Sequence, residues 1–176
     1  MNWQQYTLDN ETNVNEFALF IRDFTNELRC KKVLEVGCNV GHNLRELEKA
    51  HGIDIDITAI MKANNFYPKN NFWEDNILTT NIDWHTYDFV FTRAVLSHLN
   101  NDQVLTAMKK MCVASNSYIM TCEYYAQSYN EIPWRDEVLY CRNYAELWKK
   151  FDVKVILDTW VWNDPMKLRM CLVRII

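Results

Sequence analysis

Hydrophobic and polar positions follow two alternating patterns along most of this chain. Short apolar runs bounded by polar residues match buried strands, as in KKVLEV, YDFVFT and VKVILDTW. Between them lie segments whose apolar residues recur every three or four positions, such as DQVLTAMKKMCV and RNYAELWKKF, and this spacing predicts amphipathic helices. Strands that alternate with helices indicate an α/β fold with a largely parallel sheet.

The pattern predicts a Rossmann-like, three-layer α/β sandwich around a mostly parallel sheet of seven strands, or of fewer. Residues 1–176 are expected to form a single domain, in which 1–30 are an N-terminal arm and helix. Asn13 or Asn15 would cap that helix. The turn NDPMK joins the last two strands, which makes the last strand antiparallel. The expected strands are 31–36, 53–56, 71–73, 87–92, 117–125, 153–160 and 168–175, and the expected helices are 13–28, 44–51, 58–65, 93–99, 102–113 and 142–151.

Composition narrows the classes of function. Hydrophobic residues make up 49% of the chain, so a sizeable core can form. The net charge of -4 disfavours a nucleic-acid partner held through its phosphates. The six cysteines are scattered without a CxxC pair, which favours free thiols in a reducing cytoplasm over a metal or disulfide framework. No signal peptide or membrane-spanning run is apparent, so we expect a cytoplasmic protein without a membrane partner.

All three glycines of the chain lie between residues 31 and 56. Gly37 and Gly41 fall in a loop that follows a buried strand, and Gly52 is expected to end the next helix. The loop reads E-x-G-x-x-x-G, and Asn39 stands where a dinucleotide-binding loop has its middle glycine. A ligand without a pyrophosphate therefore fits this loop better than a dinucleotide does.

The acidic residues around the loop match the groups of S-adenosylmethionine. Glu35 can accept hydrogen bonds from its ammonium, while the N–H groups of the loop face its carboxylate. Asp54, at the end of the second strand, can accept from both ribose hydroxyls. Asp56 competes for this role, but it lies farther from the expected strand end and is better placed to cap the next helix.

The adenine of the same ligand needs an apolar slot and an acceptor for its amino group. Asp75 follows the third strand and can be that acceptor, with Asn76 beside it. Ile55 and Ile77 can form the walls of the slot. The chain thus presents a partner for each group of the ligand in sequence order.

Three runs, VLEVGCNVGHN, GIDI and YDFVFTRAVLSHL, resemble class I S-adenosylmethionine-dependent methyltransferases, and the similarity extends from Lys31 to Ile176. The run CEYYAQSYNEIPWRDEVLYCRNYAEL and the strand end DTWVWNDP look more specifically like methyltransferases associated with pseudaminic acid biosynthesis. This chain has WRDE where that group has YRGH. The resemblance implies cofactor contacts at Glu35, Gly37, Cys38, Asn39, Gly41, Asn43, Asp54, Asp75 and Thr92.

Four candidates for catalysis lie toward the second half of the chain. His98 could be a general base, because histidine titrates near neutral pH, or a packed helix residue. Glu123, Tyr124 and Tyr125 end the fifth strand, where ligands bind in such sheets, but alternation assigns at least one of the three to ordinary packing. Arg135 could clamp a carboxylate or stack on a ring, or could form a salt bridge within the loop.

The segment 126–140 is too long for a simple connector, which indicates a functional loop that determines the acceptor. Trp134 lies in this loop, and Trp160 and Trp162 alternate on one strand face. These aromatic residues could line the acceptor pocket or belong to the core. We predict methyl transfer to oxygen or nitrogen of a small acceptor such as a sugar derivative. The run Thr92–Val95 lacks an N-P-P-Y motif, which disfavours DNA amino-methylation.

Two other functions stay open from the sequence. One is a nicotinamide-dependent Rossmann enzyme, against which the missing middle glycine speaks. The other is a non-catalytic S-adenosylmethionine-binding or interaction protein with a methyltransferase fold, in keeping with the altered acceptor loop. The sequence sets neither the acceptor nor the oligomeric state.

Overall fold

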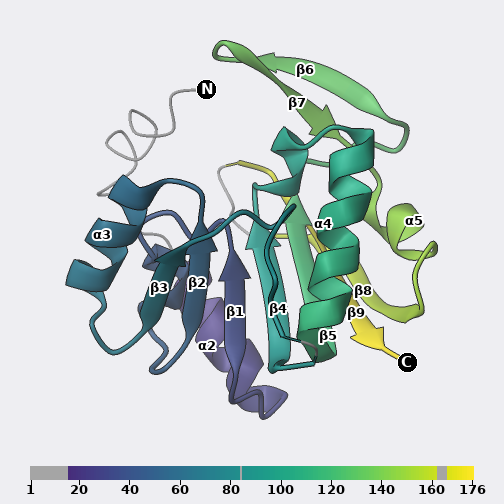
Figure 1. The fold of residues 1–176 in the computed structure, drawn as a ribbon. Helices are drawn as coiled ribbons and strands as arrows, with labels where there is room; N and C mark the ends of the chain where they lie inside the picture. The colour runs from purple at the N-terminus through teal and green to yellow at the C-terminus, as the bar shows by residue number, and fades with distance from the viewer. Residues whose placement is uncertain (1–15, 84, 162–165) are drawn as a thin grey trace. The chain divides into compact units, whose positions relative to one another are not determined.

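The computed structural model describes residues 16–83, 85–161 and 166–176. The expected N-terminal arm, the two candidate caps Asn13 and Asn15, and Trp162 lie outside these residues. The main sheet has seven strands in the order β3-β2-β1-β4-β5-β9-β8 (Figure 1), and β9 runs antiparallel to both of its neighbours. The predicted α/β fold with a mostly parallel seven-stranded sheet and an antiparallel last strand is confirmed.

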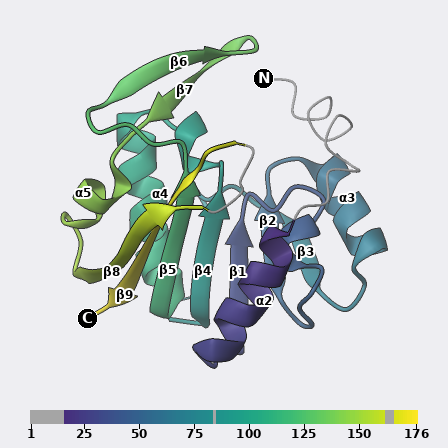
Figure 2. The same ribbon diagram turned by 180° about the vertical axis from the view of Figure 1, so that it is seen from behind.

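The described residues fall into two compact units, an N-terminal unit up to Thr80 and a C-terminal unit from Asn81. In the N-terminal unit three short strands pair in parallel. Figure 2 shows the first helix of this unit running across β1. The elements are α2 (Phe17–Glu27), β1 (Val33–Val36), η1 (His42–Leu44), β2 (His51–Asp54), α3 (Ile57–Phe66) and β3 (Asn71–Glu74).

The sequence predicted both helices of this unit, α2 and α3. The Asp56 side chain accepts from the backbone N–H of Thr58 at 2.9 Å, so Asp56 caps α3 as predicted. In α2 the aromatic side chain of Phe20 is exposed, although its apolar character favours the core. The buried face of α2 consists of Phe17, Ala18, Ile21 and Thr25.

The helix predicted at 44–51 does not form, and only the short 3₁₀ turn η1 begins there. The cause is a buried asparagine on a distant segment. Asn70 donates to the carbonyl of Leu44 at 2.9 Å and accepts from the N–H of Ala50 at 3.0 Å. These bonds occupy backbone groups that a helix would have paired within itself.

Gly52 does not end a helix but lies inside β2. A Cβ at this position would lie 2.7 Å from Cδ1 of Phe72 and 2.8 Å from Sγ of Cys38. Both distances are shorter than van der Waals contact, so the absence of a side chain lets β3 and the glycine loop pack closely on β2.

The C-terminal unit contains four strands of the main sheet and most of the large core side chains. Figure 1 shows α4 lying across β4 and β5. The segment after β4, predicted as a helix at 93–99, forms only a 3₁₀ turn. The elements are β4 (Tyr87–Arg93), η2 (Leu96–His98), α4 (Asn101–Ala114), β5 (Ser115–Glu123), β6 (Asn130–Trp134), β7 (Glu137–Cys141), α5 (Tyr144–Trp148), β8 (Val153–Trp160) and β9 (Arg169–Ile175).

The segment 126–140 is not the irregular loop that the sequence predicted. It contains most of a β-hairpin in which β6 pairs antiparallel with β7, forming a two-stranded sheet of its own. Arg135 lies in the turn with φ of 54°, in the left-handed region. The side chains of β6 are mostly exposed, so the strand lacks the apolar alternation that would have revealed it.

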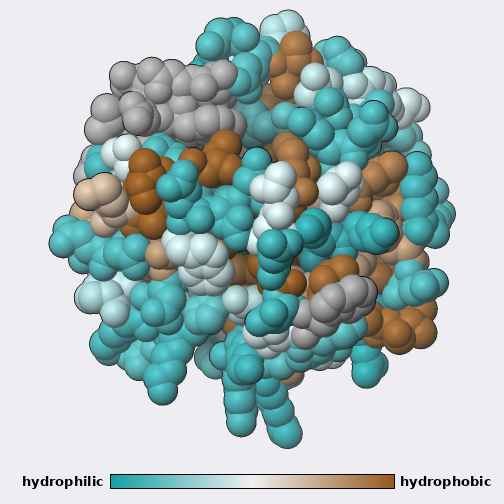
Figure 3. Space-filling model, in the orientation of Figure 1, coloured by the Kyte–Doolittle hydropathy of each residue, from teal (hydrophilic) through white to brown (hydrophobic). Residues whose placement is uncertain are grey.

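On the face shown in Figure 3, hydrophobic residues form separate small groups within a mostly hydrophilic surface. Among the described residues, no helix has both the length and the apolar character needed to cross a membrane. All six cysteines are free thiols, and four of them, Cys38, Cys122, Cys141 and Cys171, are buried.

Candidate functional site

The loop after β1 is shaped by residues in the left-handed backbone region. Gly37 and Gly41 have φ of 72° and 81°, and Asn39 has φ of 47°. Glycine takes this conformation without strain, and asparagine tolerates it better than most residues. At Gly41 there is a second reason, since a Cβ would lie 2.8 Å from the ring of Phe72. The loop is therefore held close to the unit's core.

Asp54 stands at the carboxyl end of β2, directly beside this loop. Its Oδ2 accepts from the backbone N–H of Asn39 at 2.8 Å, and its Oδ1 accepts from that of Asp56 at 2.9 Å. Burial raises the pKa of the Asp54 carboxyl, while these two N–H groups oppose the rise. Each carboxylate oxygen can accept more than one bond, so Asp54 retains acceptor capacity for a ligand's hydroxyl groups.

A second polar pair lies between β1 and the loop. Glu35 is fully buried, and its Oε1 accepts from the Asn43 side-chain amide at 2.6 Å. The side-chain oxygen of Asn39 is buried and has no hydrogen-bond partner among the described residues. A buried amide oxygen left in this state is costly, so this position suits a donor from a ligand.

The segment after β3 forms a tight turn around Asp75. Its carboxylate accepts from the N–H of Asn76 at 2.7 Å and from the hydroxyl of Thr80, while its own N–H donates to the carbonyl of Asp54 at 3.0 Å. Asp75 thus lies next to the end of β2. Ile77 is buried, whereas Ile55 is 48% exposed at the end of β2. The exposed Ile55 is available as an apolar surface for a ligand.

The side chain of Cys38 is buried rather than presented at the site. Its Sγ packs toward Gly52, and its backbone N–H donates to the carbonyl of Ile53 at 3.0 Å. Burial, with added effects of Glu35 and Asp54, raises the pKa of the Cys38 thiol well above its usual value. The geometry gives the Cys38 side chain a packing role, and the cofactor contact expected at this position stays a prediction.

In the C-terminal unit, Glu123 is enclosed by donors from the segment after β4. Its Oε1 accepts from the Thr92 hydroxyl at 2.8 Å and from the N–H of Val95 at 3.1 Å. Its Oε2 accepts from both the hydroxyl and the N–H of Ser97, at 2.8 and 3.2 Å. Glu123 and Thr92 are both fully buried. Glu123 therefore anchors η2 to β5, with its carboxylate enclosed at the end of the strand, and its catalytic role stays a prediction.

His98 ends η2 and packs against the β6–β7 hairpin. Its side chain is 10% exposed, and its Nδ1 lies 3.8 Å from Oε2 of Glu137 on β7. The rings of His98 and Trp134 are 5.1 Å apart. Burial lowers the pKa of His98, and the nearby Glu137 carboxylate opposes this shift. The imidazole is thus biased toward the neutral form that a general base requires.

Arg142 fastens the hairpin to η2. This buried guanidinium donates to the carbonyl of Leu99 at 2.7 Å, to that of Leu96 at 3.4 Å, and to the Asn101 side chain at 3.1 Å. Its Cζ also lies 5.1 Å from the ring centre of Tyr140. By contrast, Arg135 at the hairpin turn is exposed and stacks on Trp134 with Cζ 5.3 Å from the ring centre.

A cluster of aromatic side chains lies at the ends of β5 and β8. The rings of Tyr125 and Trp160 are 5.5 Å apart, edge to face. Arg169 places its Cζ 4.4 Å from the ring centre of Tyr125 and 5.5 Å from that of Trp160. Asp158 accepts from Arg169 at 2.6 and 2.8 Å, which holds the guanidinium in place. Trp160 nevertheless remains 53% exposed, as a supported aromatic surface.

Residues 6–159 match the sequence profile of a family described as methyltransferase domain. The match covers most of the chain. The chain belongs to this methyltransferase family. No curated protein matches the sequence.

Solved structures give the same fold for this methyltransferase domain. CalS10, an amino pentose methyltransferase from Micromonospora echinaspora, superposes with a TM-score of 0.74 at 10% identity, over 99% of this chain and 98% of that chain. 1,6-Didemethyltoxoflavin-N1-methyltransferase from Burkholderia thailandensis superposes with a TM-score of 0.73 at 11% identity, over 95% of this chain and 80% of that chain. Magnesium protoporphyrin IX methyltransferase from Synechocystis PCC 6803 superposes with a TM-score of 0.72 at 13% identity, over 100% of this chain and 89% of that chain. The likeness establishes the Rossmann-like methyltransferase fold.

Several of the predicted site residues contact one another in the N-terminal unit, whereas those of the C-terminal unit do not form a single cluster. In the N-terminal unit, Glu35 contacts Asn43, and Asp54 is bonded to the backbone of Asn39 and of Asp75. In the C-terminal unit, the predicted candidates separate into two groups. Thr92 and Glu123 form a buried anchor, whereas His98, Arg135 and Tyr125 lie with the hairpin and the aromatic cluster.

Sequence reasoning missed three residues of the C-terminal unit, namely Glu137, Arg142 and Arg169. Each has a partner on a distant segment: Glu137 lies near His98, Arg142 donates to Leu99, and Arg169 donates to Asp158. Local spacing gives no signal for such contacts. The nearest signal was the run WRDE itself, in which Glu137 replaces the histidine of the group that it resembles.

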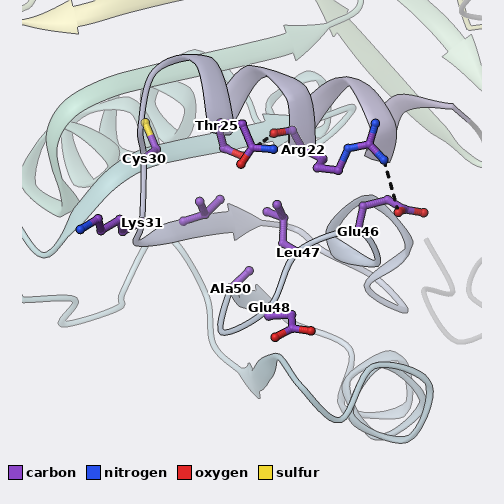
Figure 4. Close-up of a pocket in the computed structure, with 10 residues that line it drawn as sticks. Arg22, Thr25, Cys30, Lys31, Glu46, Leu47, Glu48 and Ala50 are labelled. Atoms are coloured by element: carbon purple, nitrogen blue, oxygen red, sulfur yellow. Dashed lines mark hydrogen bonds and ion pairs between the residues drawn. The ribbon is translucent and has the colours of Figure 1, made fainter.

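A cavity of about 310 Å³ lies elsewhere in the N-terminal unit (Figure 4). It is lined by α2 residues such as Arg22 and Thr25 and by the segment around Glu46, whose carboxylate lies 3.9 Å from the Arg22 guanidinium. Lys31 and Ala50 precede β1 and β2, so the cavity is at the amino ends of these strands. Ligands of open α/β sheets bind at the carboxyl ends, and we therefore place the candidate site at the glycine loop.

Proposed function

We propose that this domain is an S-adenosylmethionine-dependent methyltransferase that methylates an oxygen or nitrogen of a small acceptor such as a sugar derivative. The observation that carries the proposal is the polar arrangement around the glycine loop. The buried oxygen of Asn39 without a partner and the Glu35 carboxylate suit a ligand's ammonium. Asp54, held by two backbone N–H groups, suits a ribose.

The remaining residues after β2 and β3 support the same cofactor. Ile55 offers an exposed aliphatic side chain beside Asp54, and Ile77 is buried next to Asp75. Together they suit the flat apolar faces of adenine, with Asp75 and Asn76 nearby for its amino group. CalS10 was solved with S-adenosylmethionine bound, and the B. thailandensis enzyme with S-adenosylhomocysteine. These bound ligands agree with the cofactor that the residues of this chain suit.

The aromatic cluster supports a ring-containing acceptor. Trp160 is half exposed, and its indole is contacted by Tyr125, two residues beyond β5, and by Arg169 at the start of β9. A fixed indole face is well suited to pack on a sugar ring or on a planar heterocycle. CalS10 is an amino pentose methyltransferase, and residues 122–147 resemble the group associated with pseudaminic acid biosynthesis. Both favour a sugar-derived acceptor.

The chemistry needs little from the protein beyond alignment. When bound, S-adenosylmethionine supplies a methyl group activated by its sulfonium. Holding the acceptor's lone pair in line with that methyl can contribute roughly 7–11 kcal/mol. The neutral imidazole of His98 would accept the acceptor's proton, which contributes about 10²–10⁴-fold.

Calorimetry with S-adenosylmethionine, S-adenosylhomocysteine and NAD tests the cofactor. We expect binding of the first two at micromolar dissociation constants, on the order of -8 kcal/mol, and none of NAD. Binding of NAD alone would overturn the assignment.

Release of S-adenosylhomocysteine, measured across a panel of amino sugars, nucleotide sugars and planar heterocycles, then tests the acceptor. The variant Trp160→Ala should raise KM for a productive acceptor about tenfold and leave cofactor affinity unchanged. The exposed Ile156→Ala on the same strand is a matched control. An unchanged KM in Trp160→Ala would remove the indole from the acceptor site.

A further inference from the structure

The pair formed by His98 and Glu137 joins two elements that are far apart in sequence. His98 ends η2, and Glu137 begins β7 in the hairpin. Their closest charged atoms, Nδ1 and Oε2, are 3.8 Å apart, which is within ion-pair distance and longer than a hydrogen bond. Hydrogen bonds between catalytic groups are often long before substrate binds and shorten in the complex.

Other contacts keep the side chains of His98 and Glu137 close to each other. The Trp134 ring lies against His98, with 5.1 Å between ring centres, and this limits the rotation of the imidazole. Trp134 and Glu137 are directly paired across the hairpin. Arg142 ties the end of β7 to the carbonyls of Leu96 and Leu99 on either side of the η2 turn. The hairpin and η2 therefore keep Glu137 beside His98.

We propose that Glu137 is a positioning residue that orients His98 as the general base of methyl transfer. The inference rests on the proposed function and adds a partner to the candidate base. A carboxylate beside Nδ1 stabilises the tautomer that carries its proton on Nδ1, which leaves the basic lone pair on Nε2. It also stabilises the imidazolium that forms when Nε2 takes a proton.

The step is balanced in atoms and charge. The acceptor's oxygen or nitrogen forms a bond to the methyl carbon as the bond from that carbon to sulfur breaks, and the electron pair stays on sulfur. The acceptor's proton passes to Nε2 of His98. The positive charge lost from sulfur thus appears on the imidazole, next to the negative charge of Glu137.

Three other charged groups of the described residues near His98, namely Arg142, Arg135 and Glu123, have partners of their own. Arg142 approaches η2, but its donors are directed at backbone carbonyls and at Asn101. Arg135 stacks on Trp134 at the exposed turn. Glu123 is fully buried, and its oxygens are occupied by Thr92, Val95 and Ser97. Among these groups, Glu137 has the carboxylate that lies within ion-pair distance of the His98 ring.

The test is independent of the acceptor. The full chain, labelled with ¹⁵N-histidine and saturated with S-adenosylhomocysteine, is titrated by NMR, and His98→Asn assigns the signal. We expect the Nδ1–H tautomer of His98 in the wild type. In Glu137→Gln we expect a mixture of tautomers and a lower titration midpoint, because the carboxylate that favours the imidazolium is gone. Glu131→Gln, an exposed position in the same hairpin, should match the wild type.

The Nε2–H tautomer in the wild type would overturn the proposal without any variant. An unchanged His98 titration in Glu137→Gln would do the same. With a productive acceptor, turnover should fall about 100-fold in His98→Asn and about tenfold in Glu137→Gln, with cofactor affinity unchanged. If the NMR changes occur but no acceptor reacts with the wild type, the proposed function fails and Glu137 has no catalytic role. If an acceptor reacts equally well with Glu137→Gln, only the positioning role fails.

Discussion

The backbone N–H of Asn39 donates to Oδ2 of Asp54 across 2.8 Å, which ties the glycine loop to the end of the neighbouring strand. The other oxygen of Asp54 accepts from the N–H of Asp56. One carboxylate thus fixes both the loop and the start of α3. The same carboxylate is the proposed partner of the ribose, so the support of the loop and the binding of ligand depend on one side chain.

Replacing Asp54 by asparagine should therefore weaken cofactor binding. An amide has an acceptor on one side only, so its NH₂ group would face one of the two backbone donors. We expect the affinity for S-adenosylhomocysteine to fall tenfold or more, about 1.4 kcal/mol, in calorimetry. The control is Glu48→Gln, whose carboxylate is exposed and pairs with Lys69. Equal affinities in Asp54→Asn and wild type would refute the ribose assignment.

Gly52→Ala should destabilise the fold through close packing alone. The added methyl would approach Phe72 and Cys38 within 2.7 and 2.8 Å. Overpacking of this kind costs about 1–3 kcal/mol, measurable as a lower midpoint in urea. In a Phe72→Ala background the same change should cost less, because the ring that it meets is gone. Strict additivity of the two substitutions would show that the contact is not the cause.

Arg142→Ala should release the hairpin from η2. The substitution removes charged hydrogen bonds to the carbonyls of Leu96 and Leu99 and leaves these acceptors in a buried setting. We expect a loss of about 3 kcal/mol in stability and faster amide hydrogen exchange in residues 130–141. Arg142→Lys should recover only part of this, since an ammonium does not span the same acceptors. Exchange as slow as in the exposed control Arg135→Ala would contradict the clamp.

The stability of the protein should fall at mildly acidic pH through His98. Burial lowers the pKa of His98 below the ordinary value of 6.5, so near that pH the unfolded chain binds more protons than the native state. The contribution of His98 is complete above that value and is lost as pH falls toward the native pKa. Urea unfolding between about pH 7 and pH 5 should thus show a shallower slope in His98→Asn than in wild type. Parallel slopes would show that His98 is not the group responsible.

Strand β1, the glycine loop after it and helix α3 could be predicted from local sequence. The glycines after an apolar run indicated the loop. The position of Asp56 before an apolar segment indicated that it caps a helix. The helix expected at 44–51 failed for a non-local reason, because Asn70 takes over backbone groups of Leu44 and Ala50. The sequence of residues 44–51 contains no pattern that predicts the contact with Asn70.

The acceptor side was harder to predict for two physical reasons. The β6 strand is mostly exposed and contains Pro133, so it lacks both the alternation and the composition of an ordinary strand. Glu123 lies at the strand end where ligands bind, yet four donors enclose its carboxylate. Position in the sequence gives the edge of the sheet, but only packing decides which side chains remain accessible there.

The anchoring of the β6–β7 hairpin has a consequence for how the protein can diverge. Its attachment to η2 uses Arg142, just beyond β7, and two of the acceptors are backbone carbonyls, which any residue at 96 or 99 would supply. The exposed positions of β6 can therefore accept substitutions without breaking this attachment or the hydrogen bonds of the main sheet, whereas Leu139 and Cys141 on β7 are buried. A change in the exposed side chains of β6 thus alters the outer surface of the hairpin and leaves its anchor on η2 in place.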